Sequence, residues 1–385
     1  MSTSPTTSVF KEASVETFIY ANLAVTTLFG QYFTSMGFSP LQIGILMAVI
    51  PVSSLVSNPF WFRLRLQWPR RKAISWIALG TASLVWTVFL LPGFPGKLVG
   101  TVLLGFFLAA LVPIGEANVI ESLTKKKRTL DIPRLWGTIG FSASSLFLGL
   151  LIKLSFAILF AWSTLCALMG LMLIFRLEGL PSRVEEHDEK SPGAGPTPKR
   201  LWFYLGFAGL SISLVAFGNA FLPVVVRERG YDISLTGISF AVLSVAEIPF
   251  LFFARKIIKL FGVTLLAASG VFLLAVRITL TPFMLTPLSF VLIQLVHGWN
   301  FIVIYYSLTT YIHFFLPKNR ISHAQASFWM VFQGISYIVG SVVGGIVVNY
   351  FGLQTGYVAF GCFGFALSVP LFFVAIREKK KLVPA

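Results

Sequence analysis

Five ionisable side chains lie within long apolar runs, where a charge is costly unless it is paired or faces water. They are two acids, two arginines and one histidine: Glu116, Arg134, Glu247, Arg277 and His297. Carboxylates and histidine can bind and release protons there, and arginine can hold a carboxylate through two parallel hydrogen bonds. The sequence therefore predicts an internal polar site. The alternative is a set of salt bridges that only joins helices.

Milder polar residues recur beside these charges at helical spacing. At 100° per residue, Tyr20, Thr27 and Gln31 share one face of the first apolar run. A second polar face in the tenth run comprises His297, Asn300, Ile304, Ser307 and Tyr311. We expect Tyr20, Gln31 and Asn300 to contribute to the internal site, with hydrogen bonding between helices as the alternative.

The amino-acid composition indicates the class of protein that holds these residues. Of 385 residues, 56% are hydrophobic and only 11% are charged, which excludes a soluble globular domain. Cys166 and Cys362 both lie in apolar runs, so neither a disulfide framework nor a thiolate metal cluster is expected. We find no metal-ligand spacing, phosphate loop or Ser/His/Asp order, and expect no cofactor, metal or catalytic residue.

Hydropathy predicts an all-α membrane protein with twelve transmembrane helices. The predicted spans are 18–36, 39–62, 73–92, 98–120, 134–153, 154–175, 201–223, 235–253, 263–285, 288–315, 324–348 and 357–376. The predicted organisation is a cytoplasmic segment (1–17), a six-helix bundle (18–175), a linker (176–200), a second bundle (201–376) and a basic tail (377–385). The linker is acidic and rich in Pro and Gly, which is typical of a flexible connection.

The net charge of +16 follows this topology. Of the 30 Lys and Arg residues, only Lys97, Lys153, Arg227 and Arg229 fall in outer segments, and Arg134 and Arg277 fall at membrane depth. The rest fall on the side that the positive-inside rule makes cytoplasmic. We therefore expect both termini in the cytoplasm, a plasma (inner) membrane location and no nucleic-acid partner.

The two halves are related by an offset of 193 residues. It takes Gly37 to Gly230, Gly105 to Gly298 and Trp136 to Trp329 without a gap. An even number of spans per repeat means that both repeats cross the membrane in the same direction, which predicts two parallel six-helix bundles with a solute site between them. A complete pair of bundles in one chain predicts a monomer.

Five segments carry a family resemblance: GFSPLQIGIL (37–46), VPIGEAN (112–118), RLWGTIGF (134–141), VAEIPF (245–250) and HGWNF (297–301). Together they resemble the phenylpropionate permease branch of the major facilitator superfamily, and more distantly the lactose and nucleoside proton symporters. The resemblance spans both halves. It implies that Glu116 and Arg134 contact the solute and that Glu247, Arg277 and His297 serve binding and proton coupling.

Two departures qualify the resemblance. The segment RLRLQWPRRK (63–72) lacks the Asp and Gly that usually precede the basic pair in the superfamily, and Asn300 stands where the lactose symporter has a carboxylate. If protons are coupled, Glu247 or Glu116 must carry them. Arg134, near the end of its span, has a further reading as an interfacial anchor paired with Asp131.

These observations favour a proton-coupled symporter for a small organic solute, with Glu247 as proton acceptor, Arg277 and His297 as its modulators, and Glu116 with Arg134 as solute clamp. Arginine mildly favours organic acids. The alternatives are a sugar or nucleoside symporter, a facilitator or an exporter of the same fold. An intramembrane enzyme acting on a lipid through His297 and Glu247, or a receptor, belongs to other classes.

Overall fold

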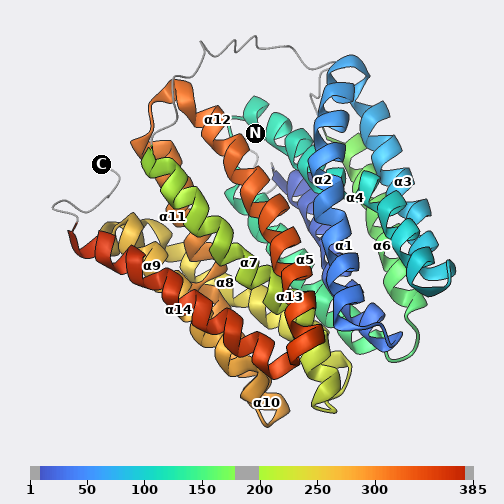
Figure 1. The fold of residues 1–385 in the computed structure, drawn as a ribbon. Coiled ribbons are helices and arrows are strands. Elements are labelled where there is room, and N and C mark those ends of the chain that lie inside the picture. Colours follow the sequence, from blue (N-terminus) through green and yellow to red (C-terminus); the bar gives the residue numbers. More distant parts are fainter. Residues whose placement is uncertain (1–8, 178–198, 378–385) are drawn as a thin grey trace. The chain divides into compact units, whose positions relative to one another are not determined.

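The structure, a computed structural model, describes residues 9–177 and 199–377, and all its regular elements in these ranges are helices (Figure 1). The first six are α1 (Phe10–Ser35), α2 (Pro40–Gln67), α3 (Arg70–Leu90), α4 (Gly93–Lys125), α5 (Asp131–Leu151) and α6 (Ala157–Phe175). The others are α7 (Lys199–Glu228), α8 (Ser234–Phe261), α9 (Val263–Leu280), η2 (Thr281–Phe283), α10 (Pro287–Leu292), η3 (Ile293–Trp299), α11 (Phe301–Phe315), α12 (Lys318–Trp329), η4 (Met330–Ile335), α13 (Ser336–Phe351) and α14 (Leu353–Arg377). The predicted linker and tail lie mostly outside the described residues.

The predicted all-α membrane fold is confirmed. Within residues 9–177 and 199–377, ten helices are long and apolar enough to cross a membrane. Helices α1 and α5 are also long, with 26 and 21 residues, but carry more polar side chains. The tenth predicted span corresponds to α10, η3 and α11 in series, and the eleventh to α12, η4 and α13.

The chain forms two compact units. Unit 1 comprises the described residues of Met1–Phe38, Leu46–His187 and Asp232–Ala241. Unit 2 comprises those of Ser39–Ile45, Asp188–Tyr231 and Val242–Ala385. The first residues of α8 thus belong to unit 1, because Gly237 leaves room for the α5 backbone: a Cβ added there would lie 2.8 Å from the Gly149 nitrogen.

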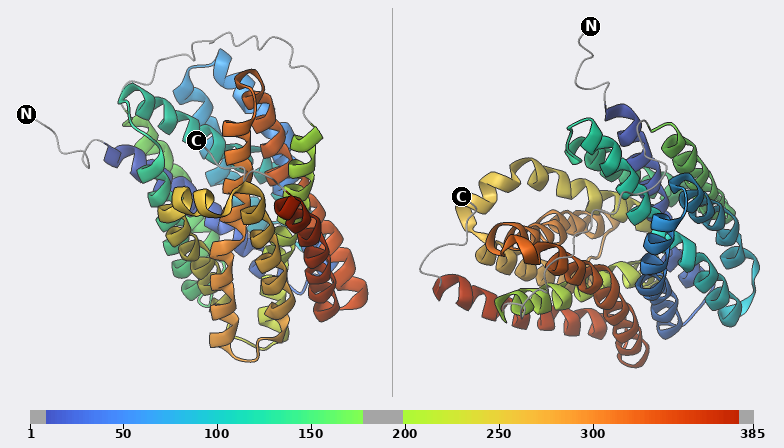
Figure 2. Two further views of the ribbon diagram at one scale, coloured as in Figure 1. Left: turned by 90° about the vertical axis from the view of Figure 1, so that its left-hand side faces the viewer. Right: turned by 90° about the horizontal axis from the view of Figure 1, so that it is seen from above.

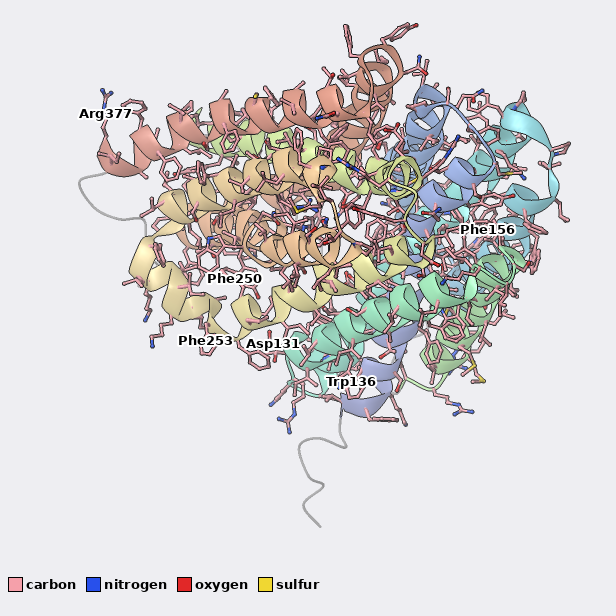
Figure 3. The ribbon with its side chains drawn as sticks, turned by 90° about the horizontal axis from the view of Figure 1, so that it is seen from below. Asp131, Trp136, Phe156, Phe250, Phe253 and Arg377 are labelled. Carbon is pink, nitrogen blue, oxygen red and sulfur yellow. The ribbon has the colours of Figure 1, made fainter. Side chains whose placement is uncertain are left out.

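In unit 1, α1 packs against α4, α5 and α6, and α3 lies beside α4 and α6 (Figure 1). The crossing of α1 and α5 is close because α5 presents glycines toward α1. A Cβ added at Gly140 would lie 2.9 Å from the Thr17 Cα, and one at Gly137 would lie 2.9 Å from a ring carbon of Tyr20. Figure 3 shows Asp131 and Trp136 in the first turns of α5, and the Trp136 carbonyl accepts a hydrogen bond from Thr17 (3.4 Å).

The glycine at this crossing is predicted to be essential for close packing. Replacing Gly140 by alanine is expected to destabilise the protein by about 1–3 kcal/mol, because the methyl group meets backbone that cannot move aside. Thermal unfolding in detergent measures the effect, with Gly206→Ala as the matched control, since nothing lies within 4 Å of a Cβ at Gly206. Equal melting temperatures for the two variants would contradict this packing.

In unit 2, α7, α9 and α14 lie side by side (Figure 2). A buried apolar cluster joins α8, α9 and α11, and its members are Phe250, Ala254, Ile258, Leu266, Ile302 and Val303. Phe250 and Phe253 are labelled on α8 in Figure 3. This packing fixes α8 against α9 and α11, and α11 follows η3, which carries His297.

The 193-residue offset also relates backbone features. Gly37 and Gly230 both have positive φ, 78° and 67°, a conformation that favours glycine. Gly105 lies against Ser53 in unit 1, and Gly298 lies against Ala246 in unit 2. Gly298 follows Gly105 by 193 residues, and Ala246 follows Ser53 by the same number. The two halves therefore share local geometry at equivalent positions.

Candidate functional site

The first cluster brings together three residues that the sequence analysis assigned to solute binding. The Tyr20 hydroxyl on α1 donates to a Glu116 carboxylate oxygen on α4 (2.8 Å). Arg134 on α5 donates to the same Glu116 oxygen and to the Tyr20 hydroxyl. Its guanidinium carbon also lies 4.4 Å from the centre of the Tyr20 ring, within the range of a cation–π interaction.

The charges of this cluster are opposite and partly accessible. The Arg134 side chain is 42% exposed and that of Glu116 is 21% exposed. The observed partner of Arg134 is therefore Glu116, whereas the alternative reading as an interfacial anchor paired it with Asp131. An arginine that is oriented by a carboxylate and an aromatic ring, yet remains exposed, can accept a further hydrogen-bonding partner.

Glu16 is a fourth member that the sequence analysis missed. It lies one helical turn before Tyr20 on α1, and its side chain is fully buried. A Cβ added at Gly137 would lie 3.5 Å from a Glu16 carboxylate oxygen, so this carboxyl faces α5 near Arg134. Hydropathy placed the start of the first span at residue 18, whereas α1 begins at Phe10. The spacing of Glu12, Glu16 and Tyr20, each four residues apart, is the signal that could have found it.

The second cluster lies in unit 2 and contains the predicted proton-coupling residues. The Nε2 atom of His297 on η3 lies 3.3 Å from a carboxylate oxygen of Glu247 on α8. The imidazole ring also stacks on Phe301, with ring centres 5.8 Å apart. Both ionisable side chains are at most 15% exposed. A buried acid in contact with a histidine can exchange a proton with it.

Arg277 contacts a residue that was not predicted. It is 1% exposed and donates from Nη1 to the Gln294 side chain (3.0 Å). Gln294 and His297 are three residues apart on η3, and residues at that spacing share a face in a 3₁₀-helix. Arg277 and Glu247 thus approach the same face of η3 through Gln294 and His297. The Nε and Nη2 atoms of Arg277 have no hydrogen-bond partner within the described chain.

The predicted polar face of the tenth span assumed one continuous α-helix, and this geometry is wrong. Residues Ile293–Trp299 form a 3₁₀-helix. Asn300, with φ −116° and ψ −72°, separates this helix from α11. The Asn300 side chain accepts a hydrogen bond from the Phe301 backbone N–H (2.9 Å) and caps α11. Asn300 is fully buried, and its side chain serves as the N-cap of α11.

Gln31 lies apart from the Glu116 cluster. Its side-chain oxygen accepts a hydrogen bond from Thr236 at the start of α8, within unit 1. Gln31 and Tyr20 are 11 residues apart on α1, which is about 16 Å along a helix axis at 1.5 Å per residue. The structure therefore brings Tyr20, Glu116 and Arg134 together and leaves Gln31 in a separate contact.

Two other groups of polar residues are buried in unit 1. On the helix ends near the predicted cytoplasmic side, Arg65 pairs with Glu121 (2.9 Å), and Glu12 pairs with Lys126 (2.8 Å). Lys97, which the topology placed in an outer segment, is 1% exposed and donates to the Tyr32 hydroxyl (2.9 Å). No group of three His, Cys, Asp or Glu side chains in residues 9–177 and 199–377 could hold a metal ion.

A surface ion pair in unit 1 joins Lys153, which follows α5, to Asp232, which precedes α8. Lys153 Nζ lies 2.7 Å from Asp232. Hydrogen bonds from Lys153 and Ser234 lower the pKa of Asp232 from 3.8 to about 2. Because the folded-state pKa is depressed, the contribution of this carboxylate to stability is present above about pH 4 and is lost as the pH falls through about 2.

This pH dependence can be followed directly, because Asp131, Asp188 and Asp232 are the three aspartates of the chain. Selective carboxyl ¹³C labelling and NMR titration are expected to show one midpoint near 2, which moves toward the ordinary value in Lys153→Met. A midpoint that Lys153→Met leaves unchanged would contradict the assigned cause.

Apolar helices that enclose two clusters of ionisable residues are the architecture of polytopic transport proteins. The model of the MFS_1 like family matches residues 17–359, and the chain belongs to that family. It is therefore a multi-pass membrane protein and a transporter, not an enzyme.

One curated relative and two solved structures of similar fold illustrate the similarity. The chain is 24% identical over 348 residues to a maltose permease of Geobacillus stearothermophilus, covering 89% of this chain and 87% of that protein. The structure of the nucleoside transporter NupG has a TM-score of 0.82 at 14% identity, covering 97% of this chain and all of that one. The inward-open structure of the xylose transporter XylE from E. coli has a TM-score of 0.70 at 13% identity, covering 98% of each chain.

Proposed function

We propose that this transporter is a proton-coupled symporter that takes up a small organic solute by alternating access. The observation that carries this proposal is the Arg134 cluster: a guanidinium oriented by Glu116 and Tyr20 inside a membrane bundle, with its side chain 42% exposed. We further propose that it acts as a monomer in the plasma (inner) membrane with both termini in the cytoplasm.

The Arg134 cluster has the chemistry of a solute clamp. Arginine offers several N–H donors in one plane, which suits a carboxylate or a pair of adjacent hydroxyls. A solute carboxylate competes with Glu116 for the guanidinium, and the released Glu116 then favours a proton. The arginine and the resemblance of several motifs to those of phenylpropionate permeases favour an aromatic or other small organic acid.

The Glu247 cluster has the chemistry of a proton site. Glu247 lies beside the imidazole of His297 (3.3 Å). His297 shares a face of η3 with Gln294, which accepts a hydrogen bond from Arg277. We propose Glu247 as proton acceptor, with His297 and Arg277 tuning its affinity. Coupling follows if the empty carrier and the carrier loaded with both solute and proton change conformation readily, whereas the half-loaded carrier does not.

A sugar or nucleoside is the second candidate solute. The similarity to a maltose permease over 89% of the chain favours it, and carboxylate, amide and arginine side chains can all hydrogen-bond to hydroxyl groups. Export driven by protons is a further outcome of the same test, because direction depends on which loaded states of the carrier change conformation.

The test is uptake into proteoliposomes with pooled aromatic acids, nucleosides and oligosaccharides under an inward proton gradient, no gradient and an outward gradient. We expect accumulation of one pool under the inward gradient only. Accumulation under the outward gradient would indicate an exporter, and equal uptake in all three conditions would indicate a facilitator. Empty liposomes are the control.

A further inference from the structure

Glu16 is a buried carboxyl group that stands apart from the other acids of α1 and α4. Its side chain is fully buried, and neither of its carboxylate oxygens has a hydrogen-bond partner within the described chain. By contrast, Glu12, one turn earlier and equally buried, accepts from Ser122 (2.5 Å) and pairs with Lys126 (2.8 Å). Two acids on the same helix therefore have opposite environments.

The groups around Glu16 leave one negative charge uncompensated. A Cβ added at Gly137 on α5 would lie 3.5 Å from a Glu16 carboxylate oxygen, and Tyr20, one turn after Glu16 on α1, contacts both Glu116 and Arg134. Helix α6, which also packs against α1, has no charged residue from Ala157 to Phe175, and the nearby Tyr20 is engaged with Glu116 and Arg134. One arginine, itself partly exposed, thus faces two carboxyl groups, of which that of Glu16 is fully buried. Two carboxylates that share a site do not both ionise readily.

We propose that Glu16 and Glu116 hold one proton between them, so that the pair and Arg134 together are electrically neutral. This is a second proton site, in unit 1, separate from Glu247 in unit 2. Its role in coupling rests on the proposed function: a solute that engages Arg134 changes the charge facing the pair and therefore its proton affinity. The proton itself does not depend on a solute, because the pair and Arg134 are present in the empty protein.

Infrared spectroscopy of the full chain in lipid tests this, since a protonated carboxyl group has a carbonyl stretch distinct from that of carboxylate. At neutral pH, Glu16→Gln is expected to remove the intensity of one protonated carboxyl group from the spectrum. Glu116→Gln is expected to remove the same intensity, because Glu16 then becomes the one acid facing Arg134 and ionises. Glu12→Gln is the matched control and is expected to leave the band unchanged.

Three results would overturn the inference: a band that Glu16→Gln leaves intact, a loss in Glu16→Gln that Glu116→Gln does not reproduce, or an equal loss in Glu12→Gln. The variants Glu16→Gln and Glu116→Gln lie on different helices, so one folding failure does not remove the test. The spectra need no solute. A wild-type protein that shows the band but no proton-driven uptake would count against the proposed symport and leave the shared proton standing.

Discussion

Replacing Arg134 by glutamine is expected to reduce solute uptake by about 100-fold or more. Glutamine removes the positive charge that faces Glu116 and Glu16, and it removes the fork of donors that a solute would engage. A hydrogen bond to a charged group contributes about 1.5–3 kcal/mol. Loss of two such bonds to the solute, each at the lower end because Arg134 is partly exposed, corresponds to about 100-fold at about 1.4 kcal/mol per tenfold. Initial uptake rates in proteoliposomes measure it.

The control for this variant is Asp131→Asn, which removes a charge from the same first turn of α5 but lies outside the Arg134 contacts. We expect its uptake to stay close to that of the wild-type protein. Wild-type rates in Arg134→Gln would show that Arg134 only supports the packing of α1, α4 and α5. Equal losses in both variants would point to general damage at the start of α5.

Replacing Glu247 by glutamine is expected to abolish accumulation driven by a proton gradient while solute exchange across the membrane continues. Glutamine keeps the shape of the side chain and its contact with His297, but it cannot take up a proton. The comparison of gradient-driven uptake with exchange of labelled for unlabelled solute separates coupling from binding. We expect the first to fall to the level without a gradient and the second to remain within a few fold of wild type.

Glu228→Gln is the matched control, because it removes a carboxyl group from the end of α7 in the same unit. Its accumulation is expected to be unaffected. Full gradient-driven accumulation by Glu247→Gln would show that proton coupling does not depend on Glu247. Loss of exchange together with accumulation would mean that Glu247 serves solute binding or packing.

The helices could be predicted from hydropathy alone, because long apolar runs separated by Gly, Pro and charged residues leave few alternatives in a membrane. The 193-residue offset was also visible in the sequence, and Gly37 and Gly230 adopt the same left-handed conformation at equivalent positions. Contacts within the Arg134 cluster were predicted in part, since a charge at membrane depth must find an opposite charge.

The remaining features depend on local geometry that hydropathy does not describe. Glu16 was missed because a hydropathy window ends where charges begin, although α1 continues to Phe10 with its acids facing other helices. The partnership of Arg277 with Gln294 depends on the 3₁₀ geometry of η3, in which residues three apart share a face. Asn300 appeared to continue an α-helical face, whereas its side chain caps a new helix.

The central claim, that solute and protons cross together, is tested most directly by driving the reaction with the solute. Proteoliposomes that contain a pH dye are given an inward gradient of the transported pool with equal pH on both sides and the membrane potential clamped. We expect acidification inside wild-type vesicles, none with Arg134→Gln, and none with Glu247→Gln. Solute entry into wild-type vesicles without any change in internal pH would contradict proton symport.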